Sequence, residues 1–323
     1  MSETMTFTAA FREGVREEMA RDGSVFVMGT DLWERGGHWA QIKGLGAEFG
    51  HERVRDTPIS EAAMVAAGVG AALKGTRPIV DLNFIDFALG AMDEIINQAA
   101  KIRYMWGRPV PLVIRGTSGV ALAGAQHNNS LEMMFAGTPG LAVVSPSNAW
   151  DAKGLIKAAL RGEDPVIFLM HKKLTGVRGV VGTDQEITPI GLAHRAREGS
   201  DLTLIGHGYA TVTALKAAEE LASRGIECDV IDLRTLSPLD GESVVESVRR
   251  TGRALIVDEA PAFGSIGNQV AAIIQSEAFW HLDAPVRVVA APLSPIPHSP
   301  VLVDAMVPSS ATVVEQALDL LGQ

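Results

Sequence analysis

Short apolar runs alternate with longer helical patterns along most of this chain, and this alternation restricts the possible fold more than any other feature. We expect strands at 25–28, 78–82, 111–115, 141–145 and 165–170 and helices at 7–21, 61–74, 87–106, 130–136 and 149–161. Repeated strand and helix units of this length are typical of α/β folds with a mostly parallel sheet.

The alternation stops at residues 174–200, which are rich in Gly, Thr, Pro and charged residues and predict a connector with one short strand at most. A second set follows, with strands expected at 201–205, 227–233, 254–257 and 286–290 and helices at 210–224, 241–250, 266–278 and 311–321. The 323 residues also fit two domains of about 150 residues each. We therefore predict α/β domains at 1–182 and 201–323, joined by a connector at 183–200.

Charge and hydropathy exclude several classes of protein. A net charge of −10 argues against nucleic acid or anionic lipid as the main partner. No apolar run reaches the ~18 residues of a membrane span, and the N-terminus lacks a basic stretch followed by an apolar one. We therefore expect a cytoplasmic protein without a membrane segment. The single cysteine, Cys228, lies in a strand-like run and is expected in the core, which excludes an internal disulfide framework.

The common nucleotide, metal and nucleophile motifs are absent or misplaced. Gly68 and Gly70 fall inside a predicted helix rather than at a strand-to-helix turn, so we expect them to permit close packing rather than bind a dinucleotide. No P-loop and no G-x-S-x-G motif occurs, and Ser118 is expected in a turn. His127 and His171 have no second ligand at zinc spacing.

The segment DTPISE, residues 56–61, places one carboxylate at the start of a helix of small residues, AAMVAAGVGAALKG. Ser60 is expected to cap this helix, and Glu61 in its first turn faces the positive end of the helix dipole, which favours the ionised form. The alternative is that Glu61 is only a favourable first-turn residue.

Four segments together resemble the beta subunits of thiamine-diphosphate-dependent 2-oxoacid dehydrogenases. They are DTPISEAAMVAAGVGAALKGTRPIVDLNFIDF, MDEIINQAAKIRYM, AQHNNSLEMMFAGTPGLAVVSPSNAWDAKGLIKAALRGEDPVIF and VIDLRTLSPLD. The resemblance spans nearly the whole chain and includes the acetoin, branched-chain and pyruvate enzymes. It implies a transketolase-like pyrimidine-binding domain followed by a transketolase C-terminal-like domain.

The resemblance gives Glu61 and Phe87 roles in binding thiamine diphosphate. Glu61 matches the glutamate that hydrogen-bonds the pyrimidine ring nitrogen and promotes the imino tautomer that removes the thiazolium C2 proton, a form of general acid–base catalysis. Phe87 matches the aromatic residue that packs on the same ring, and stacking of this kind contributes about 0.5–1.5 kcal/mol. The alternative for Phe87 is an ordinary core residue at the start of a buried helix.

His127 follows a Gly- and Ala-rich loop, GTSGVALAGAQH, and loops of this kind often carry function. It matches the histidine at the entrance used by the lipoyl arm, where a side chain that titrates near neutral pH handles protons during acyl transfer. Gln126 is its expected neighbour in the cofactor site. A helix-capping or surface histidine is the alternative.

The chain departs from the family pattern at four positions. Thr30 replaces a glutamate of the acidic tunnel that is proposed to link two cofactor sites, so communication through that tunnel is not expected from this residue. Asn128 and Asn129 stand where relatives have Ser-Gln. Met170 stands where acetoin-type relatives carry an acid before His-Lys.

No Gly-Asp-Gly motif for Mg²⁺ and diphosphate occurs in the sequence. The resemblance thus implies that an alpha subunit supplies the Mg²⁺ ligands and that the two chains form an α₂β₂ heterotetramer with thiamine diphosphate between them. The implied activity is that of an oxidoreductase that cleaves a C–C bond beside the carbonyl of a 2-oxoacid or acetoin-like donor. The acyl group would pass to the disulfide of a lipoyl acyltransferase component. The alternative is a subunit of a split transketolase-like transferase with an aldehyde acceptor.

Overall fold

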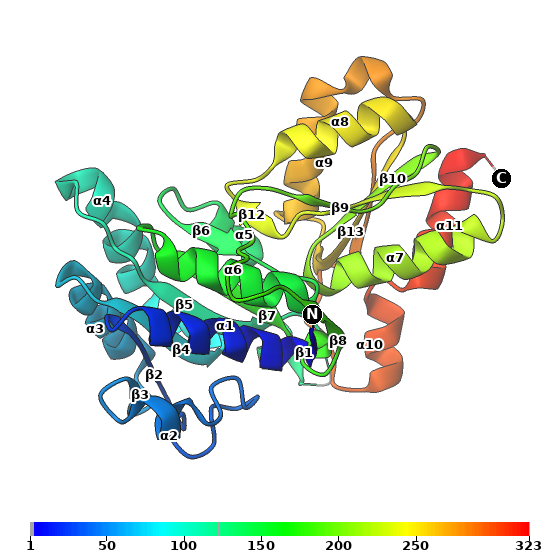
Figure 1. The fold of residues 1–323 in the computed structure, drawn as a ribbon. Coiled ribbons are helices and arrows are strands. Elements are labelled where there is room, and N and C mark those ends of the chain that lie inside the picture. The colour runs from blue at the N-terminus through cyan, green and yellow to red at the C-terminus, as the bar shows by residue number, and fades with distance from the viewer. Residues whose placement is uncertain (1–2, 122, 323) are drawn as a thin grey trace. The chain divides into compact units, whose positions relative to one another are not determined.

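The computed structural model describes residues 3–121 and 123–322, and the chain forms two compact units (Figure 1). Unit 1 comprises Met1–Ser118 and Met134–Ile190, and unit 2 comprises Gly119–Met133 and Gly191–Gln323. Unit 2 therefore takes a short segment from the first half of the chain. The predicted domain limits, 1–182 and 201–323, stay predictions.

Unit 1 is built on a parallel sheet with the strand order β6-β7-β5-β4-β2-β3. The strands are β2 (Val25–Gly29), β3 (Val54–Asp56), β4 (Arg77–Phe84), β5 (Val113–Ser118), β6 (Ala142–Val144) and β7 (Val166–His171). Strands β2, β5 and β7 are buried along their whole length, as expected when helices cover both faces of a parallel sheet. The expectation of a mostly parallel α/β fold is confirmed.

The helices of this unit are α1 (Phe7–Arg21), α2 (Leu45–Phe49), α3 (Glu61–Leu73), α4 (Ala100–Trp106) and α6 (Ala149–Arg161), while α5 (Glu132–Ala136) begins in the segment that belongs to unit 2. Figure 1 shows α1 and α6 side by side, and a Cβ on Gly14 would meet Ile156 Cγ2 at 2.7 Å. A Cβ on Gly68 of α3 would likewise meet Val80 Cγ2 at 2.7 Å, whereas one on Gly70 would meet nothing within 4 Å. The expected close packing is thus confirmed for Gly68 only.

The prediction of a single helix at 87–106 is wrong. The chain instead forms the 3-10 helix η1 (Ile85–Ala91), the π-helix η2 (Glu94–Ala99) and then α4. Phe87 therefore lies within a 3-10 turn and does not open an α-helix. Tight and wide turns of this kind depend on tertiary contacts and often lie near functional sites.

The expectation of one short strand at most in 174–200 is also wrong, since two strands form there. Strand β8 (Arg178–Val181) pairs antiparallel with β1 (Glu3–Thr6), and β9 (His194–Arg197) pairs antiparallel with β11 (Cys228–Asp232). Both partners are distant in sequence, so local composition could not reveal the pairing. Ser118, expected in a turn, is the last residue of β5 and is buried.

Unit 2 has a sheet with the order β14-β13-β10-β11-β9, parallel except for the pair of β11 with β9. The other strands of that sheet are β10 (Leu202–Gly206), β13 (Ala254–Pro261) and β14 (Arg287–Ala291), and unit 2 also contains the short strand β12 (Thr235–Ser237). The helices of unit 2 are α7 (Gly208–Ala222), α8 (Gly241–Thr251), α9 (Ile266–Glu277), α10 (Pro300–Met306) and α11 (Ser310–Leu321). Figure 1 shows α7 beside α11, and α8 beside α9 on the other face of this sheet.

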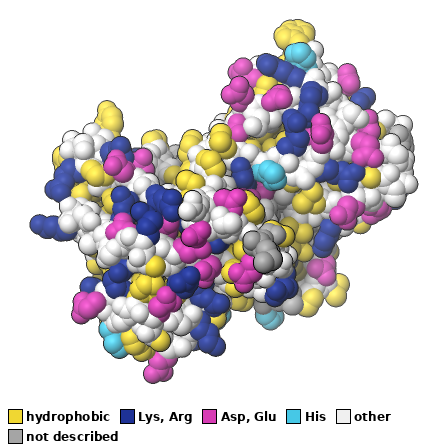
Figure 2. All heavy atoms as spheres, viewed as in Figure 1, with side chains coloured by type: hydrophobic (Ala, Val, Ile, Leu, Met, Phe, Trp, Pro, Cys, Tyr) yellow, Lys and Arg dark blue, Asp and Glu magenta, His cyan; other side chains and the backbone are white. Residues whose placement is uncertain are grey.

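The core of unit 2 includes Cys228, which is fully buried among apolar residues of α7, α11 and the central strands. Burial raises the pKa of its thiol to about 12, which keeps it protonated. The expectation of a core cysteine is confirmed. On the face of the molecule seen in Figure 2, acidic and basic side chains are interspersed within each unit.

Candidate active site

Glu61 is the first residue of helix α3, which follows strand β3 after a short loop. The amide of Met64 donates to the carbonyl of Ser60 over 2.9 Å, so the helix begins where the sequence predicts. The Ser60 side chain, however, makes no capping hydrogen bond, and this expectation is wrong. Ser60 has φ −162° and ψ 80°, outside the usual geometry of a capping serine. Glu61 itself is half-buried in the first turn.

Glu61 and Phe87 line the same cavity, which has a volume of about 200 Å³. The other lining residues come from the ends of β2 and β4 and from α3 and the loop before it: Thr30, Asp31, Ile59, Met64, Asp81, Leu82 and Asn83. The cavity thus lies at the carboxyl end of parallel strands, the edge at which α/β sheets bind ligands. It combines three carboxylate side chains, those of Asp31, Glu61 and Asp81, with an aromatic ring and aliphatic side chains.

Phe87 is 39% exposed, and it packs edge-on against Phe84 with ring centroids 6.0 Å apart. The alternative of an ordinary core residue does not agree with this exposure. A flat heteroaromatic ring that stacks on Phe87 and accepts or donates a proton at Glu61 fits these surroundings.

Thr30, the position at which the resemblance leads us to expect a glutamate in relatives, also lines this cavity. Asp31 beside it has φ +58° and forms an exposed ion pair of 3.9 Å with Arg35. Asp81 and Asn83 were not identified from the sequence. The run Asp-Leu-Asn-Phe at the end of an apolar strand is the signal that could have revealed them.

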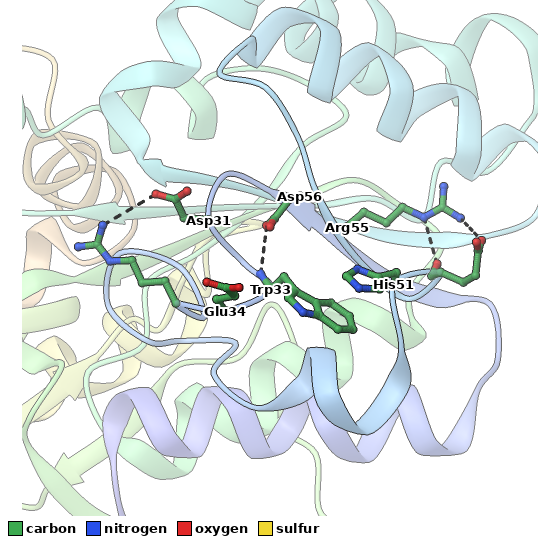
Figure 3. A pocket seen from close by; sticks show the side chains of 8 residues that line it. Asp31, Trp33, Glu34, His51, Arg55 and Asp56 are labelled. Carbon is green, nitrogen blue, oxygen red and sulfur yellow. Dashed lines mark hydrogen bonds and ion pairs between the residues drawn. The ribbon is translucent and has the colours of Figure 1, made fainter.

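A second and more open hollow of about 780 Å³ lies next to the first and shares Asp31 with it. Figure 3 shows the ring of Trp33 lying against that of His51, with centroids 3.2 Å apart. Asp56 accepts hydrogen bonds from the amides of Leu32 and Trp33 over 2.5 and 3.0 Å. These contacts fix the loop after β2, which carries Thr30 and Asp31 to the cavity of Glu61.

Gln126 and His127 belong to unit 2, in the 3-10 helix η3 (Ala125–His127). Gln126 is exposed and His127 is half-buried. Asn128 is buried, and its side-chain oxygen accepts from the amide of Ala121 over 2.9 Å, while Asn129 donates to the carbonyl of Gln126 over 3.1 Å. Asn128 and Asn129 therefore organise the loop that carries Gln126 and His127.

Buried ionisable groups of unit 2 adjoin this loop. Glu259 of β13 accepts from the amide of Val120 over 3.1 Å at the start of the loop, and Glu132 follows its end. Burial raises the pKa of Glu132 to about 7, although the nearby His207 opposes the rise. Burial lowers the pKa of His207, but the carboxylates of Asp258 and Glu132 outweigh it and the net pKa is about 9. His207 Nε2 lies 3.7 Å from Asp258 Oδ1.

Within residues 3–121 and 123–322, no group of three or more His, Cys, Asp or Glu side chains is arranged to hold a metal ion. Across the same residues, every helix is too short or too polar to cross a membrane.

The sequence matches two known families in succession. Residues 3–177 match the family described as "Transketolase, pyrimidine binding domain", and residues 191–313 match "Transketolase, C-terminal domain". A solved structure titled "Split gene transketolase, inactive beta4 tetramer" has a similar fold, with a TM-score of 0.82 and 24% identity over 98% of this chain and 99% of that one.

Three curated proteins illustrate the similarity at higher identity. The 2-oxoisovalerate dehydrogenase subunit beta of Bacillus subtilis (strain 168) is 44% identical, over 92% of this chain and 93% of that protein. The acetoin:2,6-dichlorophenolindophenol oxidoreductase subunit beta of the same organism is 41% identical over 100% and 99%. The pyruvate dehydrogenase E1 component subunit beta of Rhizobium meliloti (strain 1021) is 43% identical over 97% and 69%.

Proposed function

The chain belongs to the transketolase-like family of beta subunits of thiamine-diphosphate-dependent 2-oxoacid and acetoin dehydrogenases, and from this premise we propose that the Glu61 cavity binds the pyrimidine ring of thiamine diphosphate. The protein is the beta subunit of an oxidoreductase component and works with an alpha partner. The observation that carries the proposal is that Glu61 and Phe87 line one cavity.

The residues of the cavity suit an aminopyrimidine ring in both chemistry and shape. The carboxylate of Glu61 is a hydrogen-bond partner for a ring nitrogen, and Phe87, Met64 and Leu82 offer apolar surface to the two faces of a flat ring. A volume of about 200 Å³ accommodates a single heteroaromatic ring rather than a whole cofactor. The remainder of the molecule then extends beyond this chain.

When bound, thiamine diphosphate would supply the nucleophilic chemistry needed at the carbonyl of the donor. Glu61 would hold a proton between one of its carboxyl oxygens and the ring nitrogen, which is general acid–base catalysis by a half-buried carboxylate. Phe87 would fix the orientation of the ring. The small residues at the start of α3 leave room for it beside the backbone.

The alpha subunit completes the site in this proposal. Mg²⁺ requires near-octahedral oxygen ligands to hold a diphosphate. The Gly-Asp-Gly motif that the family uses for this purpose does not occur in the sequence. We therefore assign the Mg²⁺ ligands to the alpha subunit and the assembly to an α₂β₂ heterotetramer. A cytoplasmic location is part of the same proposal.

The proposed acyl acceptor is a lipoyl domain. Gln126 and His127 lie in a loop that hydrogen bonds from Asn128 and Asn129 organise, which would give His127 a defined position from which to hold or move a proton during acyl transfer. The names of the relatives at 41–44% identity favour a dehydrogenase over the split transketolase alternative. The donor is proposed to be a 2-oxoacid or an acetoin-like compound.

Reconstitution with an alpha subunit tests the proposal. The complex should oxidise a 2-oxoacid or acetoin with an artificial electron acceptor, and in a separate assay without that acceptor it should acylate a lipoyl domain. A complex that consumes aldehyde acceptors and leaves lipoyl domains unmodified would instead support the transferase.

A further inference from the structure

Asn83 has a backbone conformation that non-glycine residues rarely adopt. Its φ is +60°, and it lies near the end of strand β4, where pairing with β5 shifts register between Asp81 and Phe84. Asparagine tolerates the left-handed region better than most residues, yet the conformation remains less stable than an extended one. An outlier of this kind persists only where its surroundings hold it, and it suggests a functional reason.

The surroundings of Asn83 hold it through three hydrogen bonds. Its amide donates to Asp81 Oδ1 over 2.9 Å, and its carbonyl accepts from Arg115 Nη1 over 3.2 Å. Its side-chain oxygen accepts from the amide of His38 over 3.3 Å. Both polar groups of the Asn83 backbone are therefore bonded to one carboxylate and one guanidinium.

Asp81 and Arg115 form an ion pair that is almost completely buried. Their closest atoms are 3.2 Å apart, and their side chains are 1% and 0% exposed. Gln41 donates to the second Asp81 oxygen over 2.8 Å, and Arg115 Nη2 donates to Thr117 over 2.7 Å. Burying two charges loses hydration that their attraction only partly replaces, so a pair of this kind is a poor device for stability alone. Its geometry instead defines the position of what it holds.

The segment after Asn83 has little freedom once Asn83 is fixed. Helix η1 begins at Ile85, whose backbone lies against Gly116 of β5, so that a Cβ on Gly116 would meet Ile85 Cα at 2.7 Å. Phe87 follows two residues later in the same tight helix and reaches the cavity that Asp81, Asn83 and Glu61 also line.

We infer that Asn83 is a positioning residue of the cofactor site, because its left-handed conformation, which Asp81 and Arg115 hold, directs η1 and places Phe87 in the cavity with Glu61. The consequence for thiamine diphosphate rests on the proposed function above, whereas the positioning of η1 does not. Asn83, Asp81 and Arg115 do not contact the reacting atoms in this assignment.

Two substitutions at Asn83 separate the backbone conformation from the side chain. Asn83→Ala opposes the left-handed conformation, and Asn83→Gly permits it. Both remove the bond to His38. Thr30→Ala is the matched control, since Thr30 lines the same cavity and takes no part in the hydrogen bonds described above.

The first measurement needs no cofactor. Amide hydrogen exchange of residues 84–91 in the full chain should be about tenfold faster in Asn83→Ala than in wild type, as the usual cost of a left-handed alanine implies. It should change less than about threefold in Asn83→Gly and in Thr30→Ala. Equal acceleration in the alanine and glycine variants, or none in either, would overturn the inference.

The second measurement uses the reconstituted complex with the alpha subunit. Asn83→Ala should raise the apparent Kd for thiamine diphosphate about tenfold and leave kcat at saturating cofactor within about threefold, with the glycine variant close to wild type. A purely structural role would lower the melting temperature without this division between Kd and kcat. If the wild-type complex binds no thiamine diphosphate, the proposed function is wrong, and hydrogen exchange still decides the positioning role.

Discussion

The Nε atom of Arg115 lies 3.2 Å from the sulfur of Met170, so one side of a fully buried guanidinium contacts a thioether. Asp81 is the carboxylate paired with it, at 3.2 Å, among the residues that the structure describes. Met170, the position at which acetoin-type relatives are expected to carry an acid, therefore lies directly beside a buried cation. Much of the neutralisation of Arg115 then depends on Asp81.

Asp81→Asn should destabilise the chain by about 3–5 kcal/mol, because it removes the carboxylate that forms an ion pair with the buried Arg115. Met170→Glu in the same chain should recover a large part of this loss, since the new carboxylate would lie against Arg115 Nε. Urea unfolding of the single and double variants measures both effects. Asp31→Asn is the control, because its ion pair with Arg35 is exposed and long and should contribute less than about 1 kcal/mol. A double variant no more stable than Asp81→Asn would contradict this account.

The regular elements of the fold follow from local sequence patterns. The strands expected at 78–82 and 165–170 overlap β4 and β7, because runs of apolar residues buried on both faces carry their own signal. The expected helix at 87–106 failed because η1 depends on Asn83, which is held by Arg115 from another strand. The pairing of β1 with β8 likewise could not be predicted from any local pattern, because the two strands are far apart in the sequence.

The candidate site was only partly predictable. The resemblance identified Glu61 and Phe87, and the structure brings them into one cavity, while their chemical roles stay predictions. Arg115 was missed because a polar residue within an apolar strand has no spacing that marks it. Ser60 matched the composition of a helix cap, but its backbone geometry does not form one.

Glu61→Gln preserves the size of the side chain and removes the ionisable group. In the reconstituted complex this change should slow proton exchange at C2 of thiamine diphosphate by about 10²–10⁴-fold, the usual contribution of one acid–base group. The melting temperature should be almost unchanged because Glu61 is only half-buried. An exchange rate near that of wild type would remove the assigned role from Glu61.

The isolated chain should bind thiamine diphosphate weakly or not at all. It offers a cavity of about 200 Å³ that suits one ring, and no Gly-Asp-Gly motif for the diphosphate occurs in its sequence. Addition of the alpha subunit with Mg²⁺ should restore binding, which calorimetry can measure. Tight stoichiometric binding by the purified beta chain alone would show that the diphosphate site had been assigned to the wrong subunit.

The stability of the chain should fall between pH 5 and 9 through Glu132 and His207. The folded-state pKa of Glu132 is about 7 against an ordinary 4.5, so its contribution is complete below about pH 4.5 and is lost as the pH rises through 7. The folded-state pKa of His207 is about 9 against an ordinary 6.5, so its contribution is complete below about pH 6.5 and is lost as the pH rises through 9. Each contribution is at most about 3 kcal/mol.

Glu132→Gln tests the lower part of this range, because glutamine resembles the protonated acid. The free energy of unfolding of the variant, relative to wild type, should increase between pH 5 and pH 8 in urea titrations. Glu219→Gln, which removes an exposed charge, should show little such change. A relative stability of Glu132→Gln that is independent of pH would mean that Glu132 remains ionised throughout.

His127→Ala separates transfer to a lipoyl arm from the chemistry that precedes it. If His127 handles protons during acyl transfer, its removal should suppress acylation of a lipoyl domain by at least about tenfold more than donor oxidation by an artificial acceptor, since the second assay needs no lipoyl arm. Asn129→Ala is the matched control for the loop, because it removes a hydrogen bond to the Gln126 carbonyl and retains the His127 side chain. That variant should reduce lipoyl acylation less than His127→Ala does.

Equal losses in both assays for His127→Ala would exclude the lipoyl role. Should the wild-type complex acylate no lipoyl domain while it consumes aldehyde acceptors, the transferase alternative would hold, with Asn128 and Asn129 as the departures to examine first.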